Sequence, residues 1–238
     1  MKEQVPTGPF LLCIETATMV GSVALFSGSQ LLGNLQYRRA KSHARLLTPM
    51  IKTLLEDLQL APEKLDGIAV AKGPGSYTGL RVGVSTAKGL CMALDKPLIA
   101  MSSLEALAWQ AHTLAKRIDA WICPMLDARR MEVYCTLFDA ELQAQQIIEA
   151  KIIDETSFKE LLTTRKVIFL GDGAAKCQEL LEASPNAIVL ADLLSNASSM
   201  GQAIAHKFEA QDFEALVNFE PFYLKDFVAT KSRDRLRG

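Results

Sequence analysis

The sequence predicts an α/β protein of two similar domains, and three observations lead to this fold class. Short apolar runs of strand length alternate with longer segments whose apolar residues recur at helical spacing. The same order, three strands followed by alternating helices and strands, occurs twice in the 238 residues. Hydrophobic residues make up 49% and charged residues 22% of the chain, with a formal net charge of -1. This balance predicts a packed core and excludes a wholly disordered chain or a generally basic nucleic-acid coat protein.

The first predicted domain opens with an antiparallel meander. Apolar runs at residues 10–14, 20–26 and 31–37 are separated by short polar and glycine-containing turns, as is typical of strands joined by hairpins. Apolar residues then recur at helical spacing up to residue 58, and Ser42 is the expected N-cap of this helix.

A strand, a glycine-rich loop, a helix and another strand complete the first predicted domain. We place the strands at residues 65–71 and 97–101, and the helix at residues 78–94 directly after the loop. Ser102 or Ser103 is the expected cap of a further helix.

The second half of the chain repeats this order of elements with weaker signals. Its expected elements are strands at 120–126 and 132–138 around a tight connection at 127–130, a weaker strand near 145–150, a helix at 158–162, a strand at 167–170, a helix after Gly173, a strand at 188–190 and a helix at 198–209. The predicted division of the chain is a disordered extension at residues 1–9, an N-terminal domain at 10–108, a C-terminal domain at 109–224 and a basic tail at 225–238.

Neither a membrane anchor nor a disulfide framework is expected. No stretch approaches the roughly 20 apolar residues of a membrane-spanning helix, and the polar, proline-containing start resembles neither a signal peptide nor an anchor. The five cysteines are an odd number, include no CxxC pair and mostly fall in apolar runs. We therefore expect reduced core cysteines in a cytoplasmic protein without membrane partners.

The most distinctive segment is the glycine-rich stretch at residues 72–83. Glycines allow a close approach to a ligand, and the N–H groups at a helix start favour an anion. The spacing and the place in the chain exclude a P-loop and a dinucleotide fingerprint. The alternative, slightly favoured by spacing alone, is close packing of a helix on the sheet. Candidate anion contacts, here and in the polar turn after the first strand, are Thr16, Thr18, Gly73, Gly75, Ser76 and Gly79.

Two segments together resemble a known family. Ile-Glu-Thr-Ala-Thr at residues 14–18 resembles the opening of the superfamily of actin-like, sugar-kinase and Hsp70 ATPases. Gly-Pro-Gly-Ser-Tyr-Thr-Gly-Leu-Arg-Val-Gly at residues 73–83 resembles the bacterial TsaB (YeaZ) family within it, and stretches at 43–51, 127–134 and 220–224 agree. The resemblance implies two tandem actin-like (ribonuclease H-like) domains, each a mixed five-stranded sheet with helices.

The resemblance also implies a function in making threonylcarbamoyladenosine in tRNA. Members of this family are non-catalytic partners of the related TsaD, which transfers the threonylcarbamoyl group to adenosine next to the anticodon. The implied role is to bind and orient TsaD, with the ATPase TsaE, a second copy of the chain and, through the complex, tRNA as further partners. The alternatives are an ATP-dependent phosphotransferase of the superfamily and a homodimeric scaffold.

No metal site and no catalytic residue is expected. TsaD binds a metal ion through two histidines, four residues apart, on the helix after the fifth strand, and the matching positions here are Ser103 and Leu107. The three histidines, His43, His112 and His206, are far apart in the sequence. The sequence does not exclude a metal site formed by carboxylates from distant positions in the chain.

Stable nucleotide binding by the isolated chain is not expected either. The second phosphate turn of the superfamily carries glycine after its aspartate, whereas Asp127 is followed by Ala128, Arg129 and Arg130. The two arginines either bind an anion from outside or form a solvated hairpin tip. What the resemblance still allows is that ATP or ADP binds at the interface between this chain and a partner.

The helix that follows Ser42 predicts a partner surface. Its apolar residues fall on two rows, and a helix that is apolar on more than one side must be buried on more than one side. Family members are expected to pair through this helix and the one after the glycine loop. The expected partner-binding residues are Leu47, Met50, Ile51, Leu54, Leu58, Thr78 and Arg81. The alternative is that both rows fill the interior of the domain.

Two basic patches are candidate contacts for tRNA phosphates. One precedes and enters the first helix, and its members are Arg38, Arg39, Lys41, Arg45 and Lys52. The other is the stretch at residues 225–238, which holds five basic and two acidic residues. Solvated faces and a loose tail are the alternative.

Overall fold

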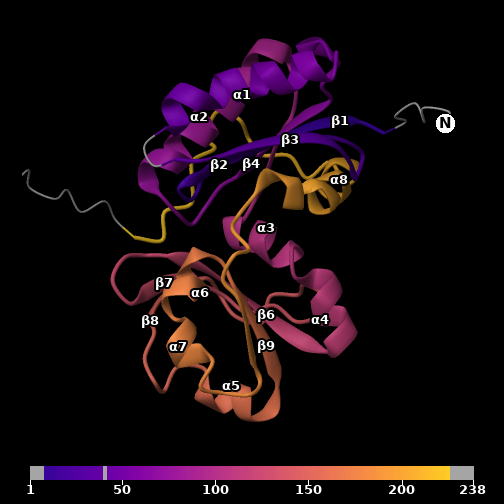
Figure 1. Ribbon diagram of the computed structural model, residues 1–238. Coiled ribbons are helices and arrows are strands. Elements are labelled where there is room, and N and C mark those ends of the chain that lie inside the picture. The colour runs from indigo at the N-terminus through magenta and orange to yellow at the C-terminus, as the bar shows by residue number, and fades with distance from the viewer. Residues whose placement is uncertain (1–7, 40–41, 226–238) are drawn as a thin grey trace, which may run out of the picture.

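The computed structural model describes residues 8–39 and 42–225, and it consists of two lobes that each contain a five-stranded sheet (Figure 1). The first sheet has the strand order β3-β2-β1-β4-β5, and the second has the order β10-β9-β6-β7-β8. In both lobes three antiparallel strands come first and two parallel strands follow. The predicted fold class, two tandem mixed five-stranded sheets with helices, is confirmed.

The first sheet contains the predicted meander. β1 (Phe10–Glu15) pairs antiparallel with β2 (Val20–Ser27), and β2 pairs antiparallel with β3 (Gln30–Arg38). On the other side of β1 lie β4 (Gly67–Ala71) and then β5 (Leu98–Met101), both parallel to their neighbours. Helices cover both faces of the sheet, which is why β1 and β4 are almost continuously apolar.

Two long helices cover the face of the first sheet that points away from the second lobe (Figure 1). α1 (His43–Asp57) contacts β2, α2 (Tyr77–Leu94) contacts β4, and the two helices also contact each other. A short 3-10 helix, η1 (Pro62–Lys64), leads from α1 towards β4. The apolar rows of both helices pack on the sheet in a single core cluster, whose members include Leu12, Ile14, Leu47, Met50, Leu54, Ile68 and Val84.

The second sheet has the same topology, with a shorter second and third strand. β6 (Ala120–Asp127), β7 (Glu132–Cys135) and β8 (Glu149–Ile152) form the antiparallel part. β9 (Lys166–Leu170) lies parallel to β6, and β10 (Ala187–Leu190) lies parallel to β9. The meander is therefore repeated in both lobes.

The expected limits of the second meander differ from the structure. β7 ends three residues earlier than expected, and Phe138 makes only isolated bridges with Ile122 and Ala144. The third strand begins at residue 149 instead of 145. β8 lies at the edge of the sheet and has no buried residue, and β7 beside it is only half buried, so few apolar contacts mark the limits of these strands in the sequence.

Three short helices cover one face of the second sheet. They are α5 (Lys159–Thr164), α6 (Asp172–Lys176) and α7 (Gln178–Leu181). Their apolar side chains pack with Cys123, Val133 and Phe169 of the strands. The expected helices at 158–162 and after Gly173 are confirmed.

The lobes exchange one helical layer. α3 (Ser103–Trp109) follows the first sheet, but it packs with α4 (His112–Ile118) mainly on β6 and β9 of the second. η2 (Ala197–Ser199) and α8 (Gly201–Glu209) follow the second sheet, but they pack on the first (Figure 1). Each sheet is thus covered on its inner face by a helix from the other half of the chain.

The chain beyond α8 also stays with the first lobe. Glu214 N donates to Leu98 O (2.8 Å), and Phe222 N donates to Lys72 O (2.8 Å). Phe219 is buried in the core of the first lobe. The expected division at residues 10–108 and 109–224 is therefore wrong for α3 and for residues 197–224. An amphipathic pattern shows that a helix has a buried face, but not which sheet it covers.

The described ends of the chain are held by specific contacts. Gly28 N donates to Pro9 O (2.8 Å), so the end of the extension expected to be disordered, 1–9, is paired with the β2–β3 turn. Lys225, the first residue of the expected tail at 225–238, forms an ion pair with Glu132. The remaining residues of these segments, 1–7 and 226–238, lie outside the described residues.

Two further features of the structure concern the cysteines and the length of the helices. All five cysteines are buried and unbridged. Among residues 8–39 and 42–225, no helix has the length and apolar character needed to cross a bilayer.

Candidate functional site

The glycine-rich loop packs directly against the turn after β1. Ser76 N donates to Ala17 O (2.6 Å), and Thr16 Oγ1 donates to Gly79 O (2.9 Å). A Cβ atom on Gly79 would lie 2.1 Å from Thr16 O, and one on Gly75 would lie 2.4 Å from Ala17 O. No larger residue fits at such distances without a backbone shift. These glycines therefore serve the close packing of α2 on the sheet, the alternative that the spacing slightly favoured.

The hydroxyl groups expected to contact an anion are engaged inside the protein. Ser76 is the N-cap of α2 and accepts a hydrogen bond from Gly79 N (3.3 Å). Thr18 Oγ1 accepts one from Val20 N (3.1 Å), and Thr16 is fully buried. The role of these residues in anion binding stays a prediction.

The end of β1 places a carboxyl group where the chain crosses between the lobes. Glu15 is fully buried; its Oε1 accepts a hydrogen bond from Ala17 N (2.6 Å) and its Oε2 accepts one from Ser195 Oγ (2.6 Å). Burial raises the pKa of Glu15 above its ordinary value, and the bonds from Ser195 and Ala17 oppose the rise. Glu15 thus ties β1 to the segment that returns from the second lobe.

The helix that leaves the first sheet begins beside this carboxyl group. Ser103 is fully buried, and its N donates to Gly73 O (2.9 Å). Its hydroxyl group lowers the pKa of Glu15, although it makes no hydrogen bond of normal geometry. Leu107, one helical turn later, is fully buried in the core of the second lobe. The positions matched to the histidine pair thus hold a poor metal ligand and an alkyl group.

A metal-binding cluster needs three or more ligating side chains close together. Within residues 8–39 and 42–225, no three or more histidine, cysteine, aspartate or glutamate side chains converge in such a cluster. His43 instead lies against the turn after β1, where its Nε2 donates to Thr18 O (2.8 Å).

Replacing Glu15 with glutamine is expected to change the pH dependence of stability. A raised pKa means that the unfolded chain releases its proton at lower pH than the folded chain does, near the ordinary value of 4.5. As the pH rises above this value, the wild-type chain loses stability until the carboxyl group ionises in the folded state as well. Glutamine does not titrate; its Oε1 can still accept from Ala17 N, and its Nε2 can donate to Ser195 Oγ, which then acts as the acceptor.

Urea unfolding at pH 5 and pH 8 measures this effect. The Glu15→Gln variant should gain stability relative to the wild type between the two pH values. Glu63→Gln, at an exposed residue of η1, serves as the control and should run parallel to the wild type. A Glu15→Gln curve that also runs parallel to the wild type would contradict the assignment.

The turn between β6 and β7 is held by a lysine from α6. Lys176 Nζ contacts the Asp127 carboxylate and donates to Glu132 O (2.6 Å). The same carboxylate accepts a hydrogen bond from Arg129 N (2.9 Å). Asp172 Oδ1 accepts one from Asp127 N (2.9 Å), and burial is the main cause that raises the Asp172 pKa. The acidic group of this turn is therefore neutralised within the chain.

The second lobe uses the same close packing as the first. A Cβ atom on Gly171 would lie 2.2 Å from Met125 O, and one on Gly173 would lie 2.9 Å from Met125 C. Gly171 also has a φ of 103°, which favours glycine. The Gly-Asp-Gly sequence at residues 171–173 thus starts α6 against β6.

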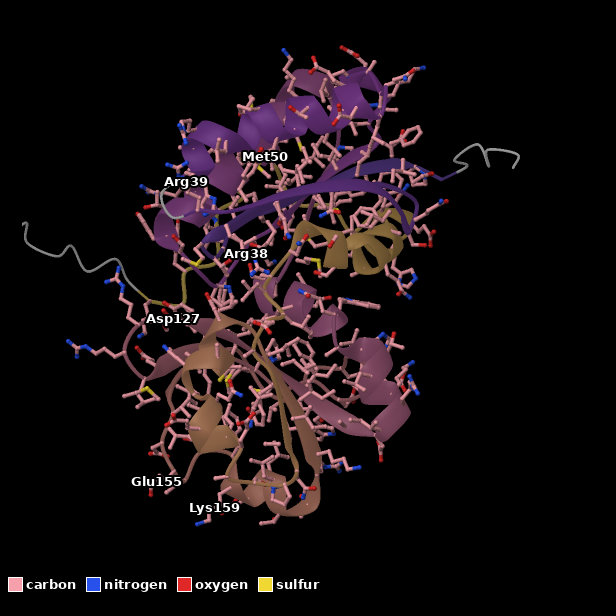
Figure 2. All side chains as sticks on the ribbon, in the orientation of Figure 1. Arg38, Arg39, Met50, Asp127, Glu155 and Lys159 are labelled. Carbon is pink, nitrogen blue, oxygen red and sulfur yellow. The ribbon has the colours of Figure 1, made fainter. Side chains whose placement is uncertain are left out.

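Of the residues expected to form the partner surface, some are buried in the core and others are exposed. Leu47, Met50, Ile51 and Leu54 are only 2–5% exposed and belong to the core of the first lobe. Figure 2 labels Met50 between α1 and the sheet. Leu58 is partly buried against the same core. This part of the prediction is wrong, because β2, β3 and α2 surround α1 within the lobe and cover both of its apolar rows.

The remaining expected residues are exposed. Thr78 and Arg81 lie on the outer face of α2, and the Arg81 guanidinium lies 4.6 Å from the centre of the Tyr77 ring. Arg129 and Arg130 are exposed at the β6–β7 turn.

The basic patch around α1 is also exposed. Arg38, Arg39 and Arg45 are exposed, whereas Lys52 pairs with Glu56 (3.6 Å). Lys41 lies outside the described residues.

Several residues that organise this region were not found from the sequence. Ser195 reaches Glu15 across 180 positions, and Lys176 reaches Asp127 across 49. Phe222 approaches the glycine loop so closely that a Cβ atom on Gly73 would lie 2.7 Å from its carbonyl oxygen. No local signal marks such contacts, because they depend on how distant elements fold together.

Comparison with known proteins identifies relatives of this chain. The family model described as "TsaD: tRNA N6-adenosine threonylcarbamoyltransferase" matches residues 32–234. The tRNA threonylcarbamoyladenosine biosynthesis protein TsaB of Bacillus subtilis is 33% identical to the chain, over 82% of the chain and 81% of the relative. The TsaB of Escherichia coli is 26% identical, over 93% of the chain and 96% of the relative.

A solved structure agrees with these relatives. YeaZ from Pseudomonas aeruginosa superimposes with a TM-score of 0.76 at 25% identity, and the match covers 91% of this chain and 100% of that one. The family model, the relatives and this structure indicate the same assignment as the glycine-rich motif. The chain therefore belongs to the TsaB (YeaZ) family of tRNA threonylcarbamoyladenosine biosynthesis proteins, which is related to TsaD.

Proposed function

We propose that this chain is a non-catalytic partner subunit that binds and orients TsaD for transfer of the threonylcarbamoyl group to adenosine next to the tRNA anticodon. Membership of the TsaB family supports a role in this modification. The single structural observation that carries the partner role is the outer face of α2.

The outer face of α2 carries an almost uncharged stripe over four helical turns. This α2 stripe consists of the exposed residues Thr78, Arg81, Ser85, Gly89 and Met92. A Cβ atom on Gly89 would meet no atom within 4 Å, and Met92 is 73% exposed. Small side chains let a second helix approach closely, and an exposed methionine adds adaptable apolar area. The stripe thus suits a helix of a protein partner.

The nearest lysine on α2 does not add charge to this stripe. Lys88 points to the side, where its Nζ donates to Phe219 O (2.9 Å) and Val217 O (3.2 Å). It therefore holds the C-terminal segment against α2. Arg81 is the one charged member of the stripe, and its guanidinium lies over the Tyr77 ring.

The ionisable groups of the loop region support a non-catalytic role. The Glu15 carboxyl group is buried and hydrogen-bonded by Ser195 and Ala17, so it is not free to take a proton from a substrate. The Asp127 carboxylate is neutralised by Lys176. In both lobes these ionisable groups are therefore engaged by other groups of the same chain.

The same geometry guides the proposal for ligands and further partners. Because Asp127 is engaged by Lys176, the isolated chain is proposed to hold no nucleotide stably, and ATP or ADP is proposed to bind only at the interface of the complex. TsaE and tRNA are proposed to join through TsaD, in the cytoplasm. Self-association through the α2 stripe is proposed to compete with TsaD.

Substitution of Ser85 tests the proposed function. Ser85→Glu introduces a charge in the middle of the α2 stripe, and glutamate is a good helix former, so folding should be unaffected. At a helix interface this larger, charged side chain would have to be buried, and Arg81 one turn earlier would offset only part of the desolvation cost, so binding to TsaD should weaken by tenfold or more. Gel filtration of the mixture measures binding, and transfer of the threonylcarbamoyl group to tRNA by TsaD and TsaE, with TsaC making the threonylcarbamoyl-adenylate donor, measures activity.

A matched variant and an omission control complete the experiment. Thr113→Glu makes the same kind of change on exposed α4 of the other lobe and should leave binding and transfer unchanged. Omission of the chain should reduce transfer by more than tenfold. Full transfer without the chain would overturn the proposed function, and an intact complex with Ser85→Glu would remove the α2 stripe from it.

A further inference from the structure

The hairpin turn between β6 and β7 holds two arginines in an unfavourable backbone conformation. Arg129 has a φ of 73° and Arg130 a φ of 51°, both in the left-handed region. The turn is closed by hydrogen bonds from Glu132 N to Arg129 O (3.1 Å) and from Ala128 N to Glu132 O (3.0 Å). The loop therefore comprises residues 129–131, and side chains other than glycine, asparagine or aspartate are strained at positive φ. The turn thus presents two guanidinium groups at a cost in backbone strain.

Neither guanidinium group is neutralised by the protein. Arg129 and Arg130 are exposed, and neither forms an ion pair with a described residue. Every ion pair between residues that the structure describes uses a lysine as its cation. The acidic group beside the turn, Asp127, is already engaged by Lys176. The two arginines therefore remain available to an anion from outside.

The turn lies on an edge at which both lobes contribute cations and aromatic rings. Lys225 pairs with Glu132 next to the turn, and its Nζ lies 5.9 Å from the centre of the Tyr134 ring. Two residues earlier, the ring of Tyr223 lies 4.8 Å from that of Tyr77 on α2. Figure 2 labels Asp127, just before the turn, at the end of the second lobe that faces the first.

These contacts form a continuous series across the junction of the lobes. It starts at Arg81, whose guanidinium lies over Tyr77, and passes through Tyr223 and Lys225 to the β6–β7 turn. Arg81 itself belongs to the α2 stripe; we call the rest of the series the junction edge, whose members are Tyr77, Tyr223, Lys225, Arg129 and Arg130. The sequence after Lys225 adds four basic and two acidic residues.

We propose that the junction edge binds the phosphate backbone of the RNA on which the complex acts, with the Arg129–Arg130 turn as its main contact. Guanidinium groups bind phosphate oxygens through paired hydrogen bonds, and an accessible tyrosine ring beside them can stack on an unpaired base. Tyr223 is 36% exposed and is the ring of this edge that RNA can reach. The inference rests on the proposed function, which brings tRNA to the complex.

A double substitution can remove the charge of the turn without destabilising the fold, so that the effect of the charge on RNA binding is measured alone. Arg129→Asn with Arg130→Gly removes both guanidinium groups and installs residues that tolerate the positive φ at these positions, so the fold should be at least as stable. The complex of the variant with TsaD is titrated with a fluorescent tRNA transcript at several salt concentrations. We expect affinity to fall about tenfold near physiological salt, and the log–log salt slope to fall by roughly 1.4 to 1.8.

A control with the same loss of charge tests the position. Arg117→Gln with Lys159→Gln removes two exposed cations from α4 and α5, and Figure 2 labels Lys159 at the far end of the second lobe. This control should bind tRNA as the wild type does. Equal loss in both double variants would show a general charge effect and would overturn the inference.

The remaining outcomes distinguish this inference from the proposed function. Gel filtration with TsaD is done before RNA is added, and failure of the unsubstituted chain to bind TsaD would overturn the proposed function. Unchanged tRNA affinity of the Arg129→Asn, Arg130→Gly complex would overturn only the junction edge. Loss of TsaD binding by this variant would show that the turn contacts an acidic protein surface, and would also overturn the inference.

Discussion

Leu54→Asp should leave the chain unable to fold. Leu54 is 3% exposed in the core cluster of the first lobe, between α1 and the sheet. The substitution removes a buried alkyl group, which costs about 2–5 kcal/mol, and it buries a carboxyl group without a partner, which costs several more. Native proteins are stable by only about 5–15 kcal/mol, so the sum approaches or exceeds the whole free energy of unfolding. Circular dichroism and thermal unfolding of the purified chain measure the loss.

The neighbouring residue provides the control for this prediction. Thr53 is exposed on the same helix, so Thr53→Asp should shift the free energy of unfolding by no more than about 0.5 kcal/mol. A Leu54→Asp chain that melts like the wild type and only fails to bind TsaD would show that this row of α1 is an open partner surface. That result would contradict the packing of α1.

Gly79→Ala should destabilise the chain through a single added methyl group. The new Cβ atom would lie 2.1 Å from Thr16 O, so the start of α2 must move away from the turn after β1. The movement would also stretch the hydrogen bond from Thr16 Oγ1 to Gly79 O. Overpacking of this kind costs about 1–3 kcal/mol or more, and for a chain of this size 3 kcal/mol lowers the Tm by roughly 6–12 °C.

The same substitution ten residues later should have the opposite effect. Gly89 also lies in α2, but a Cβ atom there would meet no atom within 4 Å. Alanine is favoured over glycine in a helix by about 0.5–1 kcal/mol, so Gly89→Ala should raise the Tm by a few degrees. Equal Tm values for the two alanine variants would show that α2 does not pack on the β1–β2 turn as described.

The elements that depend on local pattern could be predicted from the sequence. The meander of β1 to β3 and the helices α1 and α2 were found because alternation, turn residues and helical spacing are properties of neighbouring residues. The repeat of strand order in the second half followed from the same signals. The glycine-rich loop was recognised as the main feature, and its interpretation as a packing device agrees with the contacts to Thr16 and Ala17.

The features that depend on distant residues could not be predicted. The breadth of the apolar stripe on α1 indicated burial on two sides, but it could not tell a partner from the rest of the lobe, so Leu47 and Met50 were misplaced. The exchange of α3 and α8 has no local signal either. The neutralisation of Asp127 depends on Lys176, which the fold brings from 49 residues away.

The exchange of helices has a consequence for synthesis on the ribosome. All five strands of the first sheet have been made by residue 101, but α8, which covers one face of that sheet, follows roughly 100 residues later. At about 5–20 residues per second, this face waits on the order of 5–20 s for its cover. During translation the nascent first lobe therefore presents an apolar sheet, including Leu11 and Ile99, that only the end of the same polypeptide can shield.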